Sequence, residues 1–220
     1  MLLILSSLAL GITIAYFATR ITSTRRGGRL EAAILYAAIA LNSTPIFWIA
    51  MLLLSIFSVY LGWFPLFGNV DPSISSGVGY YVSVIRHAVL PILTLSGALF
   101  GESYLLLRGS VQEVLRSDYV VAAKSRGLRD KIISSRYVLR NSLLPLISVM
   151  SFSLASLISR VVLVEAVFGY PGLGDLIVDA VGGRDYPVLT GSFFFLTMII
   201  LAGGLIGDYL LTKMDPRLNL

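Results

Sequence analysis

The chain has 220 residues, no cysteine and a single histidine, His87. These absences exclude disulfides, thiolate nucleophiles and cysteine-based zinc sites, and they leave His87 as the sole base for a Ser-His-Asp triad. Charged residues are also scarce, at 13%, whereas 56% of residues are hydrophobic and the mean hydropathy is +0.86. Soluble domains contain about 25% charged residues, so this composition indicates a membrane protein.

Five apolar runs are long enough to span a bilayer, which requires about 20 residues per helix. We therefore expect an all-α polytopic membrane protein that forms one domain over residues 1–220. The second run contains Asn42-Ser43-Thr44-Pro45, where proline removes a backbone donor and predicts a kink. The expected spans are residues 2–18, 32–61, 88–107, 143–164 and 193–211.

The distribution of the 17 basic residues predicts an orientation. Lys and Arg concentrate in the cytoplasmic loops of membrane proteins. If the C-terminus is cytoplasmic, most basic residues fall on that side, and the outer side keeps Arg86, Arg160 and Arg184. We expect a multi-pass plasma-membrane protein with its N-terminus outside and its C-terminus in the cytoplasm.

The segment 108–141, between the third and fourth runs, is polar, basic and longer than a connector needs to be. Its first half predicts an amphipathic helix that continues beyond the membrane and ends near Gly127, and Asp130 is a candidate N-cap for a second helix. These residues alone leave two interpretations open: an amphipathic surface on anionic lipid, or a docking element for another protein. The apolar residues at helical spacing are Val111, Leu115, Tyr119 and Ala122.

Two stretches of this segment carry a resemblance to a known family, Asp118-Tyr-Val-Val-Ala-Ala-Lys-Ser-Arg-Gly127 and Arg140-Asn-Ser-Leu-Leu-Pro145. They resemble the EAA loop of the membrane subunits of ABC importers, with valine at position 121 in place of the acidic residue. The distance from Gly127 to Pro145 resembles the oligopeptide, dipeptide and nickel permease family. Permeases of that family usually carry an additional N-terminal span and an extracytoplasmic segment before the first helix seen here. Further stretches resemble the same family in the expected order: 43–48, 61–65, 164–174, 184–187 and 215–217.

This resemblance implies the type I ABC importer permease (MetI-like) fold, with the segment 108–141 as a cytoplasmic coupling insert. It implies a non-catalytic subunit that forms half of the translocation pathway for peptides or a related solute. The implied partners are a second permease subunit in a heterodimer, two cytoplasmic ABC ATPase subunits and an extracytoplasmic solute-binding protein; no nucleic acid is expected. The sequence has no glycine-rich loop ending in Gly-Lys-Ser/Thr, so ATP and Mg²⁺ are expected on the ATPase subunits, with no cofactor or metal on this chain.

The resemblance also assigns ATPase coupling to residues within the insert. Small alanines permit close approach of a partner, and glycine permits a backbone angle that larger side chains resist. The candidate coupling residues are Asp118, Ala122, Ala123, Arg126, Gly127 and Leu128.

Polar and ionisable residues within spans are costly, which makes them candidates for lining a solute pathway. Glu102 also suits an interfacial carboxylate packed on another helix, and Arg160 is close enough to the outer end of its span to snorkel. In the outer loop, Asp175 and Asp179 are candidates for docking the solute-binding protein, or are simply solvated. The candidate pathway residues are Asn42, Thr44, Glu102 and Arg160.

Two other function classes are compatible with parts of the sequence. Gly172-Leu-Gly-Asp175 matches the Gly-x-Gly-Asp pattern of intramembrane aspartyl proteases, but those enzymes need a second aspartate in a Tyr-Asp dipeptide. None of the 11 tyrosines is followed by aspartate. The remaining alternative is a stand-alone secondary transporter or channel, which has no evident need for a basic docking insert.

Overall fold

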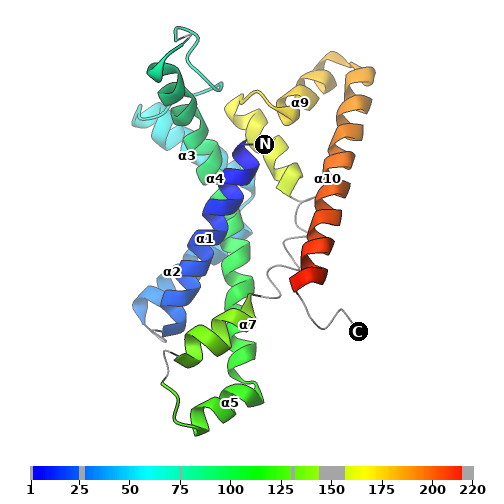
Figure 1. Cartoon of the computed structure of the whole chain (residues 1–220). Helices are drawn as coiled ribbons and strands as arrows, with labels where there is room; N and C mark the ends of the chain where they lie inside the picture. The colour runs from blue at the N-terminus through cyan, green and yellow to red at the C-terminus, as the bar shows by residue number, and fades with distance from the viewer. Residues whose placement is uncertain (1, 25–27, 75, 130–131, 144–156, 215–220) are drawn as a thin grey trace. The chain divides into compact units, whose positions relative to one another are not determined.

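The computed structural model describes residues 2–24, 28–74, 76–129, 132–143 and 157–214. Within these ranges the ordered elements are all helices, which confirms the predicted all-α class (Figure 1). The elements are α1 (Leu2–Thr24), α2 (Arg29–Ser43), α3 (Ile46–Leu53), the π-helix η1 (Leu54–Tyr60), α4 (Val78–Leu115), α5 (Asp118–Ser125), the π-helix η2 (Ile133–Leu139), α7 (Arg140–Ser142), the helix Leu157–Phe168, α9 (Leu173–Gly183) and α10 (Tyr186–Met214).

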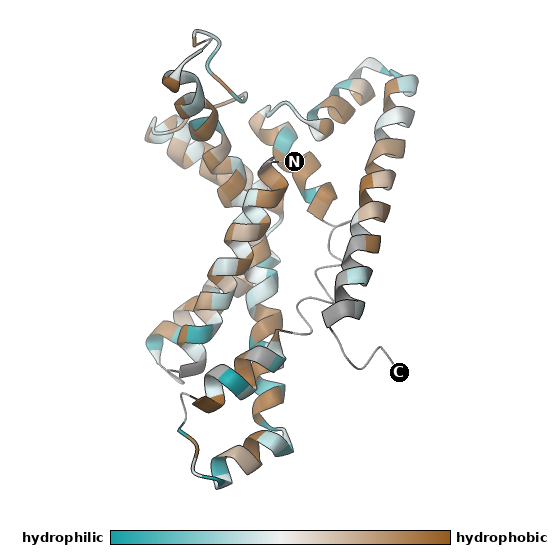
Figure 2. Ribbon diagram, viewed as in Figure 1, coloured by the Kyte–Doolittle hydropathy of each residue, from teal (hydrophilic) through white to brown (hydrophobic). Residues whose placement is uncertain are grey.

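In the described part of the chain, three helices are long and apolar enough to cross a membrane: α1, α4 and α10. Two bent helix pairs bring the number to five if each pair counts as one span. Figure 2 shows brown, apolar residues along most of α10, and the window Tyr186–Leu205 has a mean hydropathy of 2.1 with 6% of its residues buried. A helix that is apolar on all sides and poorly covered by its own chain suits contact with lipid or another membrane subunit.

The predicted second span, 32–61, is divided in the structure into two helical segments, α2 and the continuous pair of α3 and η1. Pro45 stands at the break between α2 and α3, with φ −56° and ψ 133°. Proline lacks the N–H that would continue the ladder of α2, and its ring disfavours helical geometry in the residue before it. The sequence therefore shows the position of the break.

The other predicted spans differ from the observed helices mainly at their ends. The third, 88–107, is the middle of α4, which extends from Val78 to Leu115 and contains Pro91. The fifth, 193–211, lies within α10. Most of the fourth lies outside the described residues, and its last part is in the helix Leu157–Phe168.

The chain divides into two compact units, which are described separately. The first comprises Met1–Leu10, Thr44–Ala98 and Ala155–Ala202. Apolar side chains at long sequence separation form its core, and Val164 and Leu95 are fully buried there. The buried members of this core are Leu3, Ala50, Ala88, Leu90, Leu95, Val161, Val164 and Phe168.

The second unit comprises Gly11–Ser43, Leu99–Leu154 and Gly203–Leu220. In one core of this unit, α1, α2 and α4 pack through small residues and through Tyr104. A Cβ atom on Gly101 would lie 2.8 Å from the carbonyl oxygen of Ala38 and 3.0 Å from the backbone nitrogen of Asn42. Glycine at 101 is therefore what lets α4 approach the backbone of α2. The buried members of this core are Ala15, Ala18, Ala38, Tyr104 and Leu107.

Candidate functional site

The segment after α4 folds into a compact arrangement of short helices, α5, η2 and α7, which we call the insert (Figure 1). We predicted one amphipathic helix continuing from Val111 through Ala122, and this is wrong because the chain turns at Arg116 and Ser117 before α5 begins at Asp118. Ser117 is extended, with ψ 147°, and its hydroxyl donates to the carbonyl oxygen of Val114. Serine competes with helix continuation in this way.

A separate small core holds the insert together. Val111 from α4, Val120 and Ala123 from α5, and Ile133 and Val138 from η2 are all buried. The partly buried side chains around them include Leu128 and Tyr137. This packing fixes α5 against the end of α4 and against η2.

The opposite face of α5 is exposed. The side chains of Val121 and Tyr119 are 54% and 43% exposed, and Ala122 and Lys124 are exposed beside them. Exposed apolar residues flanked by basic groups are typical of a surface that binds another protein or an anionic membrane. We call Tyr119, Val121, Ala122, Lys124 and the C-cap residue Arg126 the exposed face of α5.

The structure separates the two alanines that the sequence treated alike. Ala122 is exposed, whereas Ala123 is 4% exposed and packs inside the small core. Leu128 also contacts this core, and Asp118 lies in the first turn of α5, where its charge favours the helix N-terminus. Ala123 and Leu128 therefore support the helix, and Ala122 is the alanine that a partner can contact.

Gly127 ends α5 in the left-handed region, with φ +72°. Its N–H donates to the carbonyl oxygen of Lys124 at 2.9 Å, and the N–H of Arg126 donates to that of Ala122 at 3.2 Å. A Cβ atom at Gly127 would meet nothing within 4 Å, so glycine is required here for its backbone angle and not for space. This agrees with the prediction that the helix ends near Gly127; the predicted N-cap Asp130 lies outside the described residues.

Asn141 links two parts of the insert. Its Nδ2 atom donates to the backbone carbonyl of Tyr137 at 2.8 Å and to the hydroxyl of Tyr119 at 3.3 Å. The motif that includes Asn141 was visible in the sequence, but its contact with α5 was not. The side chain therefore joins α7 to the exposed face of α5.

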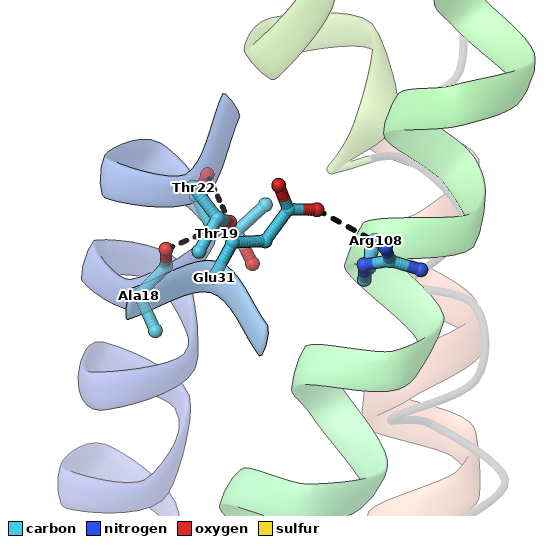
Figure 3. Close-up of polar contacts among 5 residues, drawn as sticks. All are labelled: Ala18, Thr19, Thr22, Glu31 and Arg108. Atoms are coloured by element: carbon cyan, nitrogen blue, oxygen red, sulfur yellow. Dashed lines mark hydrogen bonds and ion pairs between the residues drawn. The ribbon is translucent and has the colours of Figure 1, made fainter. Parts of the chain in front are cut away.

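An ion pair that the sequence did not reveal joins α2 to α4 above the insert. The Nη2 atom of Arg108 lies 3.0 Å from Oε1 of Glu31, and the side chains are 29% and 18% exposed (Figure 3). On the neighbouring α1, the hydroxyls of Thr19 and Thr22 donate to backbone carbonyls of their own helix, at 2.8 and 3.0 Å. Figure 3 shows the Glu31 carboxylate directed at Arg108.

The four candidate pathway residues are divided between the two units. Asn42 and Glu102 belong to the second unit, where Asn42 is exposed and Glu102 half-buried. Thr44 and Arg160 belong to the first unit, and both are half-buried. Their role in lining a pathway stays a prediction.

The two candidate docking residues lie on α9. Asp175 is half-buried in its first turn, and Asp179 is exposed one turn later. The helix ends at Arg184, whose φ of 54° is left-handed. Asp179 is thus the more accessible of the two carboxylates.

A polar hollow of about 410 Å³ lies between the loop after η1 and the first turns of α4. The N–H and hydroxyl of Ser73 donate to Oδ1 of Asp71 at 2.9 and 2.7 Å, and these bonds hold the pKa of Asp71 below its ordinary value. His87 is half-buried, and its Nδ1 atom lies 2.8 Å from the carbonyl oxygen of Ser83. Two bonds hold the loop to α4: Arg86 donates to the carbonyl oxygen of Trp63 at 2.8 Å, and the N–H of Asp71 donates to the hydroxyl of Ser83 at 2.9 Å.

Comparison with known proteins gives a consistent family. A family model described as "Binding-protein-dependent transport system inner membrane component" matches residues 7–220. The di/tripeptide transport system permease protein DppB of Pseudomonas aeruginosa is 29% identical over 222 residues, which cover 94% of this chain and 66% of DppB. A putative peptide transport system permease protein of Brucella abortus is 34% identical over 219 residues, which cover 99% of this chain and 68% of the relative. The oligopeptide transport system permease protein AppB of Bacillus subtilis is 31% identical over 219 residues, which cover 100% of this chain and 68% of AppB.

The chain spans about two thirds of the length of these relatives. Among solved structures, a chain of the MetNI methionine ABC transporter in an inward-facing conformation matches with a TM-score of 0.67 and 14% identity. The match covers 96% of this chain and 94% of that chain. It confirms the predicted fold, and the family model confirms the resemblance read from the ordered motifs.

Proposed function

Because the chain belongs to the family of binding-protein-dependent transport system inner membrane components, we propose that it is the permease subunit of an ATP-driven importer of peptides. It is a transport subunit and not itself an enzyme. The peptide substrate is supported by the printed names of relatives such as DppB and AppB. The observation that carries the coupling role is the insert, a rigid helical element whose apolar and basic face is exposed.

Coupling requires an element that transmits movement without deforming. The small core of Val111, Val120, Ala123, Ile133 and Val138 supplies this rigidity, and α5 is anchored by it to the long helix α4. A separate ATPase subunit bound to Val121 and Ala122 can then displace α4 when it closes on ATP and Mg²⁺. In this scheme the nucleotide and metal belong to the ATPase subunits.

The proposed arrangement places the insert in the cytoplasm and α9 outside the cell. The positive-inside rule supports this orientation, since the insert is strongly basic, and the N-terminus is then outside and the C-terminus inside. A second permease subunit completes the pathway as a heterodimer, and the poorly covered α10 offers apolar surface for lipid or for that subunit. A solute-binding protein docks on the outer side, with α9 as the candidate surface.

The test purifies the importer complex through a tag on this chain and measures two quantities: retention of the ATPase subunit and ATP-dependent peptide uptake. Val121→Asp places a charge on the exposed face of α5, and Gln112→Asp, at an exposed position on α4, is its matched control. We expect the control to retain the ATPase subunit, and Val121→Asp to lose it together with ATP-dependent peptide uptake into proteoliposomes. Peptide transport by the chain alone, without ATP and unaffected by Val121→Asp, would instead establish the secondary-transporter alternative.

A further inference from the structure

The bend between the helix Leu157–Phe168 and α9 is built around Glu165. The two helices meet at 71°, and Glu165 is 8% exposed. The backbone N–H of Gly174, in the first turn of α9, donates to Oε2 of Glu165 at 2.7 Å. The backbone carbonyl of Glu165 also accepts the N–H of Tyr170 at 2.9 Å, so this one residue engages the connecting loop and the start of α9.

Two glycines make room for the Glu165 carboxylate. A Cβ atom on Gly172 would lie 2.2–2.4 Å from the carboxylate carbon and both of its oxygens. A Cβ atom on Gly174 would lie 2.4 Å from the Cα of Val162 and 2.8 Å from Oε2 of Glu165. Side chains at 172 and 174 are therefore incompatible with this arrangement, although neither glycine has a left-handed φ.

Burying a carboxylate is costly unless its oxygens accept hydrogen bonds. Here the first N–H groups of α9 have no partner within their own helix, and the positive end of the helix dipole faces the carboxylate. The Glu165 carboxylate therefore supplies the acceptor that the N–H of Gly174 lacks, and this N–H supplies a hydrogen bond to the buried carboxylate. Removing the carboxylate leaves a buried N–H of Gly174 without its acceptor, which weakens the attachment of α9.

The attachment decides which side of α9 faces outward. Gly174, Ile177 and Ala180 are buried, and Asp179 and Val181 are exposed. We infer that Glu165 is a positioning residue, a clamp that holds α9 at its angle and so orients the outward face on which Asp179 lies. The consequence for transport rests on the proposed function, in which the solute-binding protein docks on this face.

The glycine contacts predict how alanine variants at Gly172 and Gly174 should behave in the wild-type and Glu165→Ala backgrounds. Gly172→Ala collides with the Glu165 carboxylate. Its effect on the distance across the bend should therefore disappear when Glu165→Ala has already removed that group. Gly174→Ala collides with the Val162 backbone, so its effect should persist in the same background. Gly182→Ala is the matched control on α9, since a Cβ atom there would meet nothing within 4 Å.

The geometry can be measured directly because the chain contains no cysteine. Spin labels at Leu163→Cys and Val181→Cys, two exposed positions on either side of the bend, report the distance across it by pulsed electron resonance in the reconstituted importer. We expect Glu165→Ala to broaden or shift the distance distribution, and Glu165→Gln, which keeps an acceptor oxygen, to preserve most of it. An unchanged distribution in Glu165→Ala, or an equal effect of Gly172→Ala in both backgrounds, would overturn the clamp.

A second experiment compares basal and binding-protein-stimulated ATP hydrolysis by the wild-type importer and its Glu165 variants. Glu165→Ala should leave basal hydrolysis unchanged and reduce stimulation at least threefold, whereas Glu165→Gln should stay within twofold of wild type. Normal stimulation in Glu165→Ala, with a disturbed distance distribution, would overturn the orienting role. Absence of stimulation in the wild-type importer would contradict the proposed function, and the distance measurement still decides the clamp.

Discussion

The guanidinium of Arg108 and the carboxylate of Glu31 lie 3.0 Å apart although 77 residues separate them in the chain. The pair connects α2 to α4 one helical turn beyond Tyr104, which is fully buried in the core shared by these helices. Both charged side chains are mostly covered, which reduces screening by water. The pair therefore contributes to holding the last turns of α4, and hence the insert, at a set position relative to α2.

Breaking this pair from either side should destabilise the protein. Glu31→Ala leaves the Arg108 charge uncompensated, and we expect a loss of about 1–3 kcal/mol, between the values for exposed and fully buried pairs. The measurement is thermal unfolding in detergent. The double variant Glu31→Ala/Arg108→Leu should lose less than the sum of the single variants, and strict additivity would show that the two side chains are not coupled.

A side chain at Gly101 should separate α2 from α4. The obstacles are backbone atoms of Ala38 and Asn42, which cannot rotate away, so Gly101→Ala should cost about 1–3 kcal/mol as overpacking. Gly109→Ala on the same helix is the control, because a Cβ atom there meets nothing within 4 Å and alanine favours the helix. Equal melting temperatures for the two variants would contradict the close approach.

Substitutions at Gly127 should follow the cost of a left-handed backbone. That cost is roughly 1–2 kcal/mol for most residues and smaller for asparagine, so we expect Gly127→Asn to be milder than Gly127→Ala, and Gly127→Val to be the most severe. Hydrogen exchange of the amides in α5 is the measurement, since the helix end should fray in proportion. Asparagine and valine variants with the same exchange rates would show that the φ of +72° is not what requires glycine.

The charge of Asp179 should matter for docking more than that of Asp175. Asp179 is exposed, whereas Asp175 is half-buried in the first turn of α9, where a lysine would also disturb the helix terminus. We expect Asp179→Lys to lower binding-protein-stimulated ATP hydrolysis several-fold at low salt, with basal hydrolysis unchanged. Asp179→Glu keeps the charge and should behave as wild type. Full stimulation of the lysine variant would indicate that this carboxylate is simply solvated.

Local features of the sequence predicted local features of the structure. The apolar runs gave the long helices, Pro45 marked a break, and Gly127 marked the end of α5. These follow from the length of a membrane span, the missing proline N–H and the backbone freedom of glycine, none of which depends on distant residues.

Contacts between distant residues were not predictable. The sequence did not distinguish the exposed Ala122 from the buried Ala123, because neighbouring helical positions differ in environment only once the partner surface of η2 is in place. Glu165 lies in the stretch 164–174, which the sequence marked only by its resemblance to the family. The reason for Gly172 and Gly174 emerged only with the Glu165 carboxylate beside them.

The sequence by itself determined that this is a helical membrane protein with a basic insert, because hydropathy, charge distribution and ordered motifs are carried by contiguous residues. The tertiary structure alone decided which face of α5 is open, how Arg108 meets Glu31 and how Glu165 holds α9. Those outcomes depend on side chains brought together from distant parts of the chain, where the desolvation of charges and the exclusion of overlapping atoms select one arrangement among many.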